Sequence, residues 1–135
     1  MAGAFLDSNI LIYAFANDPR SVRARELLEQ RPVLSVQSLN EFSNIARRKL
    51  GRDCRWLREA LDAIRVCCPT VQAVTLETHS EALRLAERYG YSIFDSLIVA
   101  SALGADCDTL WSEDMQHGMK VDGRLRIANP FRKES

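Results

Sequence analysis

The sequence has few of the residues that build zinc sites and disulfide frameworks. Its 135 residues include only four cysteines and two histidines, and no two cysteines have the C-x-x-C spacing. Cys67 and Cys68 are adjacent, a spacing typical of neither a zinc knuckle nor an ordinary disulfide framework. We therefore expect no zinc site. We expect the cysteines to be small buried hydrophobes in a reducing cytoplasm.

Long apolar runs are also missing. The longest, Leu97 to Leu103, is interrupted by Ser101 and is far shorter than the ~20 residues of a membrane-spanning helix. The first residues lack the basic stretch and apolar segment that are typical of a signal peptide. These absences predict a soluble, cytoplasmic protein.

Excess charge of either sign is absent, because 18 basic residues balance 18 acidic ones. The total charge therefore neither favours nor excludes a nucleic-acid partner. An apolar content of 47% and the length fit one globular domain with its own core. We place that domain at residues 1–131, followed by a loose tail at 132–135.

Predicted strands alternate with predicted helices along the chain. The strands are expected at 4–7, 33–35, 71–76, 109–111 and 125–128. The helices are expected at 9–16, 21–30, 36–50, 77–89 and 92–103, with one more that begins after Asp53. This alternation predicts an α/β fold with a mostly parallel sheet and helices on both faces.

Three local expectations follow from the same patterns. Val22, Leu27 and Leu28 form the apolar side of the helix at 21–30. Gly51 ends the helix at 36–50, and Asp53 caps the next one. The helix at 92–103 is apolar nearly all round, which predicts that it is buried.

Four carboxylates occupy positions where side chains converge in such a fold. Asp7 ends the first strand, Glu41 lies in the helix after the second, Asp95 opens the buried helix, and Asp114 follows the strand at 109–111. Open α/β sheets bind ligands at the carboxyl ends of their strands. Clustered carboxylates suit Mg²⁺ or Mn²⁺ and repel one another without a cation.

Three of these residues also have a purely structural interpretation. Asp7 or Ser8 could cap the helix that follows. Ser92 and Asp95 fit the capping-box pattern before an apolar run. Asp114 could be a turn or cap residue.

Glu41 has the least support from periodicity. It shares a helix face with Gln37, Asn44 and Arg48, away from the apolar stripe. A solvated face, or a contact between Glu41 and Arg48, is the structural alternative.

Positive charge is concentrated between residues 47 and 58. Six basic residues stand there against one acid, Asp53: Arg47, Arg48, Lys49, Arg52, Arg55 and Arg58. Near an acidic metal site, such a patch would hold a phosphate backbone, and Arg47, Arg48, Lys49 and Arg52 are our candidates for RNA contact. The alternatives are a solvated helix face and a surface for an acidic protein partner.

Taken in order, the acidic segments resemble a known family. Residues 5–9, 38–41, 91–100 and 109–115 are similar to the four acidic motifs of PIN-domain nucleases, most closely the VapC-type toxin ribonucleases of bacterial toxin–antitoxin pairs. Residues 127–131 also resemble the usual end of that family. The resemblance covers nearly the whole chain, and its strength lies in the order and spacing of the motifs.

The resemblance implies a three-layer α/β/α domain in which Asp7, Glu41, Asp95 and Asp114 face one pocket and hold Mg²⁺ or Mn²⁺. Asp7 and Asp95 would be the main ligands, with Glu41 and Asp114 as further or water-mediated ones. Asn9 and Ser112 would support the site by hydrogen bonding. Ser112 departs from the threonine that the family often has, but it keeps the hydroxyl.

The implied reaction is metal-assisted hydrolysis of RNA phosphodiester bonds. No histidine adjoins the acidic motifs, so the carboxylates and the metal would carry the proton transfers. The resemblance also implies a cognate antitoxin, whose tail would block the pocket with a basic side chain, and a homodimer. Trp56 and Leu57 suit either the core or an interface.

Two other functions remain open. The same fold would serve RNA processing or DNA cleavage, which the motifs do not distinguish. A non-catalytic binding module with a degenerate site belongs to a different class, and the intact acidic quartet argues against it.

Overall fold

A computed structural model describes residues 3–132 of the chain. Apart from Arg132, the tail predicted at 132–135 lies outside the described residues. Within residues 3–132, no helix is both long and apolar enough to cross a membrane.

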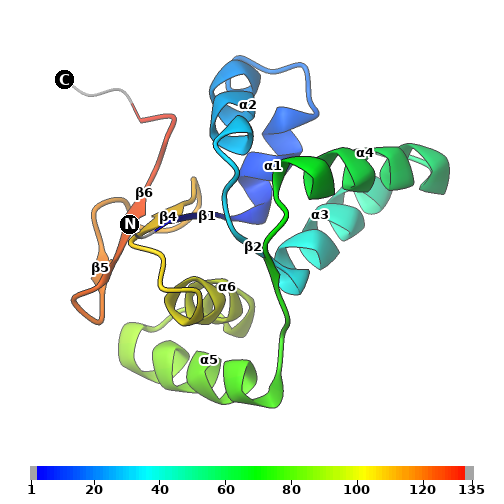
Figure 1. Ribbon diagram of the computed structural model, residues 1–135. Helices are drawn as coiled ribbons and strands as arrows, with labels where there is room; N and C mark the ends of the chain where they lie inside the picture. The colour runs from blue at the N-terminus through cyan, green and yellow to red at the C-terminus, as the bar shows by residue number, and fades with distance from the viewer. Residues whose placement is uncertain (1–2, 133–135) are drawn as a thin grey trace.

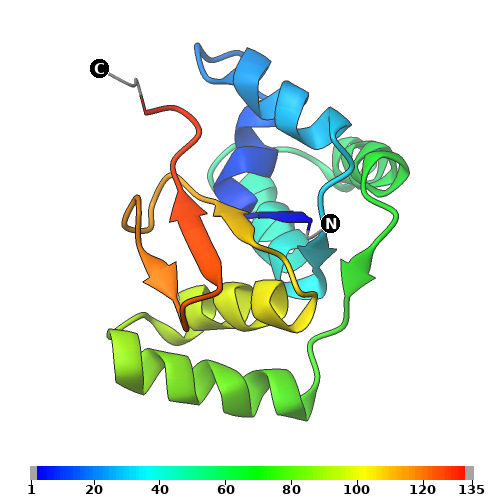
Figure 2. The ribbon, with the colours of Figure 1, turned by 60° about the vertical axis from the view of Figure 1, so that its left-hand side comes forward.

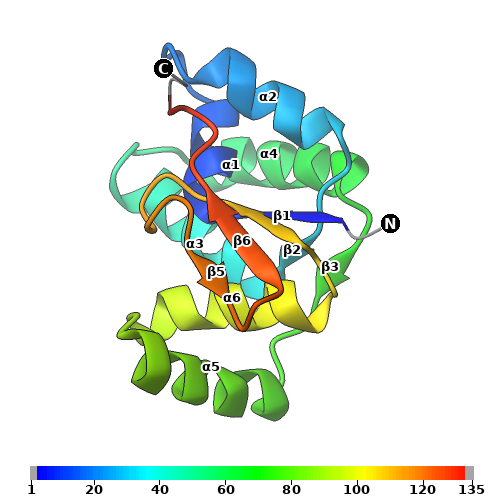
Figure 3. The ribbon, with the colours of Figure 1, turned by 90° about the vertical axis from the view of Figure 1, so that its left-hand side faces the viewer.

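A mostly parallel sheet forms the centre of the fold (Figure 3). Strands β1 (Ala4–Leu6), β4 (Thr109–Trp111) and β6 (Leu125–Ala128) are parallel, and β5 (Lys120–Val121) pairs antiparallel with β6. On the other side of β1, a bridge between Phe5 and Val33 adds the parallel pair β2 (Leu34–Ser35) and β3 (Val71–Gln72). The carboxyl ends of β1 and β4 therefore lie side by side.

Helices cover the two faces of this sheet as separate layers (Figures 1 and 2). One layer contains α1 (Ser8–Ala14), α2 (Ser21–Glu29), α3 (Val36–Arg48) and α4 (Cys54–Cys67). The other contains α5 (Leu76–Tyr89) and α6 (Ile93–Gly104). The predicted three-layer α/β/α architecture is confirmed.

The two layers follow from the alternation of side chains along the strands. Phe5 of β1 packs with Leu110 and Ile127 in the core beneath α5 and α6. Leu6, the next residue, packs in the core formed by α1 to α4. Phe5 and Leu6 are thus both fully buried, on opposite faces of the sheet, and this burial fixes the register of the strand.

The predicted helix boundaries hold where the chain has a clear cap. Asp53 accepts a hydrogen bond from the Trp56 amide at 2.8 Å at the start of α4. Gly51 has a φ of +62°, and the Arg52 amide reaches back to the Ala46 carbonyl at 3.0 Å, as in a Schellman motif. Eight of the twelve residues of α6 are buried, as predicted.

One strand prediction was too long, and one strand was missed. The strand expected at 71–76 ends at Gln72, because Thr75 caps α5 and exchanges hydrogen bonds with Thr78. Strand β5 was not predicted. It forms because Asp122 and Gly123 both have positive φ, the geometry of a type I′ hairpin turn.

Burial corrects other expectations. Val22 is 65% exposed, and Ala24 joins Leu27 and Leu28 on the buried side of α2. Leu57 lies in the core, and Trp56 stacks on Phe42 with ring centroids 6.3 Å apart.

The cysteines are all free thiols, but only two fit the prediction of buried hydrophobes. Cys68 and Cys107 are buried, whereas Cys67 is half-buried. Cys54 is exposed at the first position of α4, so the prediction is wrong for that residue.

Candidate active site

The four predicted carboxylates line one cavity of about 270 Å³ at the carboxyl ends of β1 and β4. Its lining residues are Asp7, Ser8, Glu41, Asn44, Ile45, Asp95 and Asp114. The described wall thus contains four acids and no lysine or arginine. Strand order explains the convergence, because Asp7 follows β1 and Asp114 follows the neighbouring β4.

Asp7 is the most buried of the four, with 4% exposure. One carboxylate oxygen accepts a hydrogen bond from the Ser8 amide at 2.7 Å, so Asp7 also caps α1. The other oxygen accepts a hydrogen bond from the Ser112 hydroxyl at 2.8 Å. Helix capping and a place in the cavity are therefore compatible roles for this residue.

Glu41 faces the cavity rather than open solvent. Its carboxylate accepts hydrogen bonds from the Ser8 hydroxyl at 3.2 Å and the Gln37 amide at 3.5 Å. The alternative of a solvated Glu41, or of one paired with Arg48, is wrong. The helix face itself was correctly identified, since Asn44 also lines the cavity.

Asp95 and Asp114 each take part in one hydrogen bond that involves a side chain, the first within a helix turn and the second between distant segments. The Ser92 hydroxyl accepts a hydrogen bond from the Asp95 amide at 3.1 Å, which is the serine half of the expected capping box. Asn9 donates its side-chain amide to Asp114 at 3.0 Å. Ser112 also accepts from the Met115 amide at 3.3 Å, which ties the 112–115 loop to the strand end.

Burial and repulsion raise the pKa of three carboxyls in the cavity: Asp7, Glu41 and Asp95. Desolvation raises the pKa of Asp7, aided by the charges of Asp95 and Asp114 and opposed by the hydrogen bonds from Ser112 and Ser8. Desolvation also raises the pKa of Glu41, with Asp7 as the next cause, and the pKa of Asp95, with Asp114 as the next cause. A cation in the cavity would offset both the desolvation of the carboxylates and their mutual repulsion.

The donor chemistry of the cavity fits Mg²⁺ or Mn²⁺, which prefer carboxylate oxygens. Among residues 3–132, no three His, Cys, Asp or Glu side chains are close enough to form a ready-made cage for a bare ion. Water or phosphate oxygens would have to complete the coordination shell, as they commonly do for Mg²⁺.

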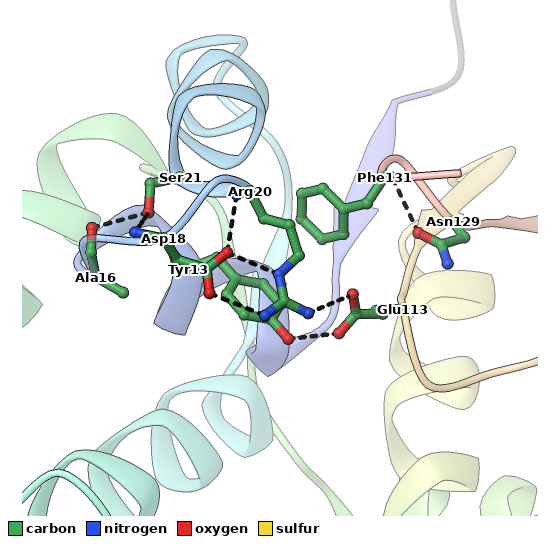
Figure 4. Close-up of polar contacts among 8 residues, drawn as sticks. All are labelled: Tyr13, Ala16, Asp18, Arg20, Ser21, Glu113, Asn129 and Phe131. Carbon is green, nitrogen blue, oxygen red and sulfur yellow. Dashed lines mark hydrogen bonds and ion pairs between the residues drawn. The ribbon is translucent and has the colours of Figure 1, made fainter. Parts of the chain in front are cut away.

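A polar network supports the loop that carries Asp114 (Figure 4). Glu113 accepts a hydrogen bond from the Tyr13 hydroxyl at 2.5 Å and one from Arg20 at 2.9 Å. Arg20 also binds both carboxylate oxygens of Asp18, and its guanidinium lies 4.0 Å from the centre of the Tyr13 ring. This network links the α1–α2 connection to the 112–115 loop.

We expect Tyr13→Phe to lower the free energy of unfolding by about 1 kcal/mol, because it removes one hydrogen bond to a charged acceptor and keeps the ring contacts. Urea denaturation measures the change. The matched control is Tyr91→Phe, because the buried Tyr91 hydroxyl bonds no described residue and its loss should be neutral or stabilising. Equal effects of the two substitutions would contradict this interpretation.

The basic stretch splits into two groups. Arg47, Arg48 and Arg52 line a second cavity of about 630 Å³, which shares Asn44 with the carboxylate cavity. None of these three arginines makes an ion pair within the described part of the chain. Lys49, Arg55 and Arg58 are exposed and line neither cavity, and Arg55 pairs with Glu59 one turn further along α4.

Sequence reasoning missed several residues around the cavity. Ser8 bridges Asp7 and Glu41 through its amide and hydroxyl, and only its place beside Asp7 pointed to it. Asn44 was signalled by its helix face, shared with Glu41. The contacts of Tyr13 and Arg20 with Glu113 join residues about a hundred positions apart, and no local pattern indicates them.

Comparisons with known proteins bear on the family and the fold of the chain. The model of the PIN domain family matches residues 4–118. No curated protein matches the chain at a significant level.

Three solved structures are similar in fold. Mycobacterium tuberculosis VapC20, described as a sarcin–ricin loop cleaving toxin, has a TM-score of 0.67 and 23% identity, over 82% of this chain and 89% of that one. A toxin–antitoxin complex from Klebsiella pneumoniae has a TM-score of 0.73 and 17% identity, over 96% of this chain and 99% of that one. VapBC2 from Rickettsia felis, bound to a DNA fragment from its promoter, has a TM-score of 0.67 and 18% identity, over 93% of this chain and 97% of that one. At these identities the likeness establishes the fold.

Proposed function

Because the chain belongs to the PIN domain family, we propose that it is a Mg²⁺- or Mn²⁺-dependent ribonuclease and the toxin of a toxin–antitoxin pair. The observation that carries the proposal is the single cavity lined by Asp7, Glu41, Asp95 and Asp114. The similar structures, which are described as a toxin and as toxin–antitoxin complexes, support the biological role. We place its action in the cytoplasm.

A divalent cation, when bound, polarises a phosphoryl oxygen and lowers the pKa of water, which supplies a nucleophile at neutral pH. Asp7 and Asp95 would hold the cation directly, and Glu41 and Asp114 would complete the set. The chain's own contribution is orientation. Ser112 and Ser8 hold the Asp7 carboxylate, and Asn9 holds Asp114.

The test is cleavage of RNA by the purified protein with Mg²⁺, with Mn²⁺ and with a chelator. Cleavage that requires the cation supports the proposal. Parallel assays on tRNA, structured ribosomal RNA fragments and single-stranded DNA separate a toxin ribonuclease from an RNA-processing or DNA-cleaving enzyme. Failure to bind Mn²⁺ in calorimetry would favour a non-catalytic module instead.

The arginine-lined cavity should contact the RNA backbone. We expect the double substitution of Arg47 and Arg48 by alanine to weaken RNA binding. A plot of the logarithm of the RNA association constant against log [salt] should also have a slope that is shallower by about 1.4. The reason is that two contacts with phosphates of single-stranded RNA are lost. Fluorescence anisotropy at several salt concentrations measures both quantities.

The matched control is Arg55→Ala, because Arg55 belongs to the same basic stretch but is paired with Glu59 and lies outside the cavity. Arg55→Ala should leave the slope unchanged. An identical loss in both variants would favour general charge over a located contact, and an unchanged slope in the double variant would favour a protein partner for this patch.

We also propose an antitoxin partner and a homodimer. An antitoxin segment with a basic side chain would complement the four carboxylates, which have no cationic neighbour in the described wall of the cavity. Val66 and Leu76 are 78% and 80% exposed, which leaves apolar surface on α4 and α5 for a partner. Copurification with a small protein that carries a basic tail tests the antitoxin, and mass measurement of the purified protein tests the homodimer.

A further inference from the structure

Phe94 is an exception to the pattern of α6. The helix is buried along most of its length, yet Phe94, one residue before Asp95, is 59% exposed. Its neighbours Tyr91 and Ile93 pack against the core beneath α5 and α6, but Phe94 is absent from that set. Packing of the described core therefore does not account for an aromatic side chain at this position.

Phe94 lines a third cavity, of about 350 Å³, beside the carboxylates. The other lining residues are Gln37, Asn40, Glu41 and Asn44, all from α3. Glu41 and Asn44 also line the carboxylate cavity, so the two spaces adjoin. The exposed lining is mostly apolar and includes the flat face of the Phe94 ring, and the side-chain amides add a smaller polar share of donors and acceptors.

Three chemical environments follow one another along α3. The cavity of Phe94 lies at Gln37 to Asn44 and the carboxylate cavity at Glu41 to Ile45. The arginine cavity begins at Ser43 and continues past the end of α3 to Arg52. The helix rises about 10 Å between Asn40 and Arg47. A nucleotide within an RNA strand presents the same order of groups: a base, the phosphate to be cleaved, and the next phosphate.

We propose that this cavity binds one unpaired base of the substrate next to the scissile phosphate, with the base stacked on Phe94 and its edge facing the amides of Gln37, Asn40 and Asn44. The inference rests on the proposed ribonuclease function and specifies its substrate. A base inside a duplex is already stacked and cannot enter such a cavity. The substrate is therefore single-stranded at this position.

The composition of the cavity favours a base over a protein segment. Phe94 is the only aromatic or aliphatic side chain in the described lining. Protein interfaces gain most of their affinity from clusters of buried apolar and aromatic anchors, and one ring among three amides and an acid does not form such a cluster. A planar base needs one stacking face and a polar edge, which is what the lining provides.

The experiment compares the affinity of the protein for ten-nucleotide RNA homopolymers with its affinity for an abasic chain of ten ribose phosphates, in a chelating buffer in which the proposed function predicts no cleavage. The ratio isolates the contribution of the bases, because the backbone charge is the same. We expect Phe94→Ala to lower this ratio by about 5- to 150-fold for at least one homopolymer, since base–aromatic stacking contributes about 1–3 kcal/mol per base. Affinity for the abasic chain should not change.

Two further variants give the experiment its controls. Phe94→Trp should keep the ratio, because it keeps an aromatic face. Leu83→Ala removes a side chain of α5 that is 52% exposed and lies outside this cavity, and it should have no effect. An unchanged ratio in Phe94→Ala would overturn the inference. So would a change confined to the oligomeric mass of the protein or to its retention of an antitoxin.

Cleavage of the same homopolymers is followed separately from binding. A wild-type protein that prefers base-bearing chains through Phe94 but cleaves no RNA would refute the proposed function and leave the base site standing. A protein that cleaves RNA with an unchanged ratio in Phe94→Ala would refute the base site alone.

Discussion

Asp7→Asn is expected to remove metal-dependent RNA cleavage, with a rate lower by on the order of 10³-fold, or about 4 kcal/mol of transition-state stabilisation. Asparagine is close to aspartate in shape but has no charge for a cation. The Ser8 amide and the Ser112 hydroxyl can still bond its side chain, so the fold around the cavity should persist. Single-turnover cleavage of labelled RNA, at several Mn²⁺ concentrations, measures the loss.

Asp95→Asn should behave in the same way, because Asp95 lines the same cavity from α6. The control is Asp62→Asn, which removes an exposed carboxylate from α4 outside the cavity and should keep full activity. Retention of wild-type rates in both Asp7→Asn and Asp95→Asn would refute the assignment of this cavity as the active site. Loss of activity together with lost helical circular dichroism would instead point to misfolding.

The sequence predicted the fold because the signals that specify it are local. The apolar strand at 4–7, the cap at Asp53 and the apolar surface of α6 can each be identified within a few residues. A parallel sheet built from such units places the ends of β1 and β4 together. The placement of Asp7 near Asp114 follows from that topology.

The features that sequence reasoning missed depend on contacts between distant segments. Whether Glu41 faces solvent or the cavity depends on how α3 packs beside α1, which periodicity within α3 does not specify. The cavity beside Phe94 depends on the approach of α3 to that residue. The two-residue strands β3 and β5 are too short to give a periodic pattern, although the Asp122–Gly123 pair was a usable signal for the second.

Asp7→Asn should also make the metal-free protein more stable at neutral pH, although it is inactive. Burial raises the pKa of Asp7 in the folded state above its ordinary value of 3.8. Such a group favours folding fully at pH values below 3.8, and this contribution is lost as the pH rises through the folded-state pKa. Asparagine does not titrate, so the variant avoids the cost of a buried charge.

The difference in unfolding free energy between Asp7→Asn and wild type should therefore be smallest in acid, rise above pH 3.8 and then level off. The rise is about 1.4 kcal/mol for each unit by which folding raises the pKa of Asp7. Relief of repulsion on Glu41 acts in the same direction, since the charge of Asp7 raises the pKa of Glu41.

Groups with a lowered pKa, such as Asp122, are common to both proteins and cancel in this difference. Urea titrations in a chelating buffer measure the difference at each pH.

Mn²⁺ at 100 times its dissociation constant should then stabilise the wild type by about 2.7 kcal/mol and the variant by less, because only the wild type keeps the full set of carboxylates. A difference that stays constant with pH, or that falls as the pH rises, would mean that the Asp7 carboxylate carries no ionisation penalty. The cavity would then lack the unfavourable burial of negative charge that a bound cation would neutralise.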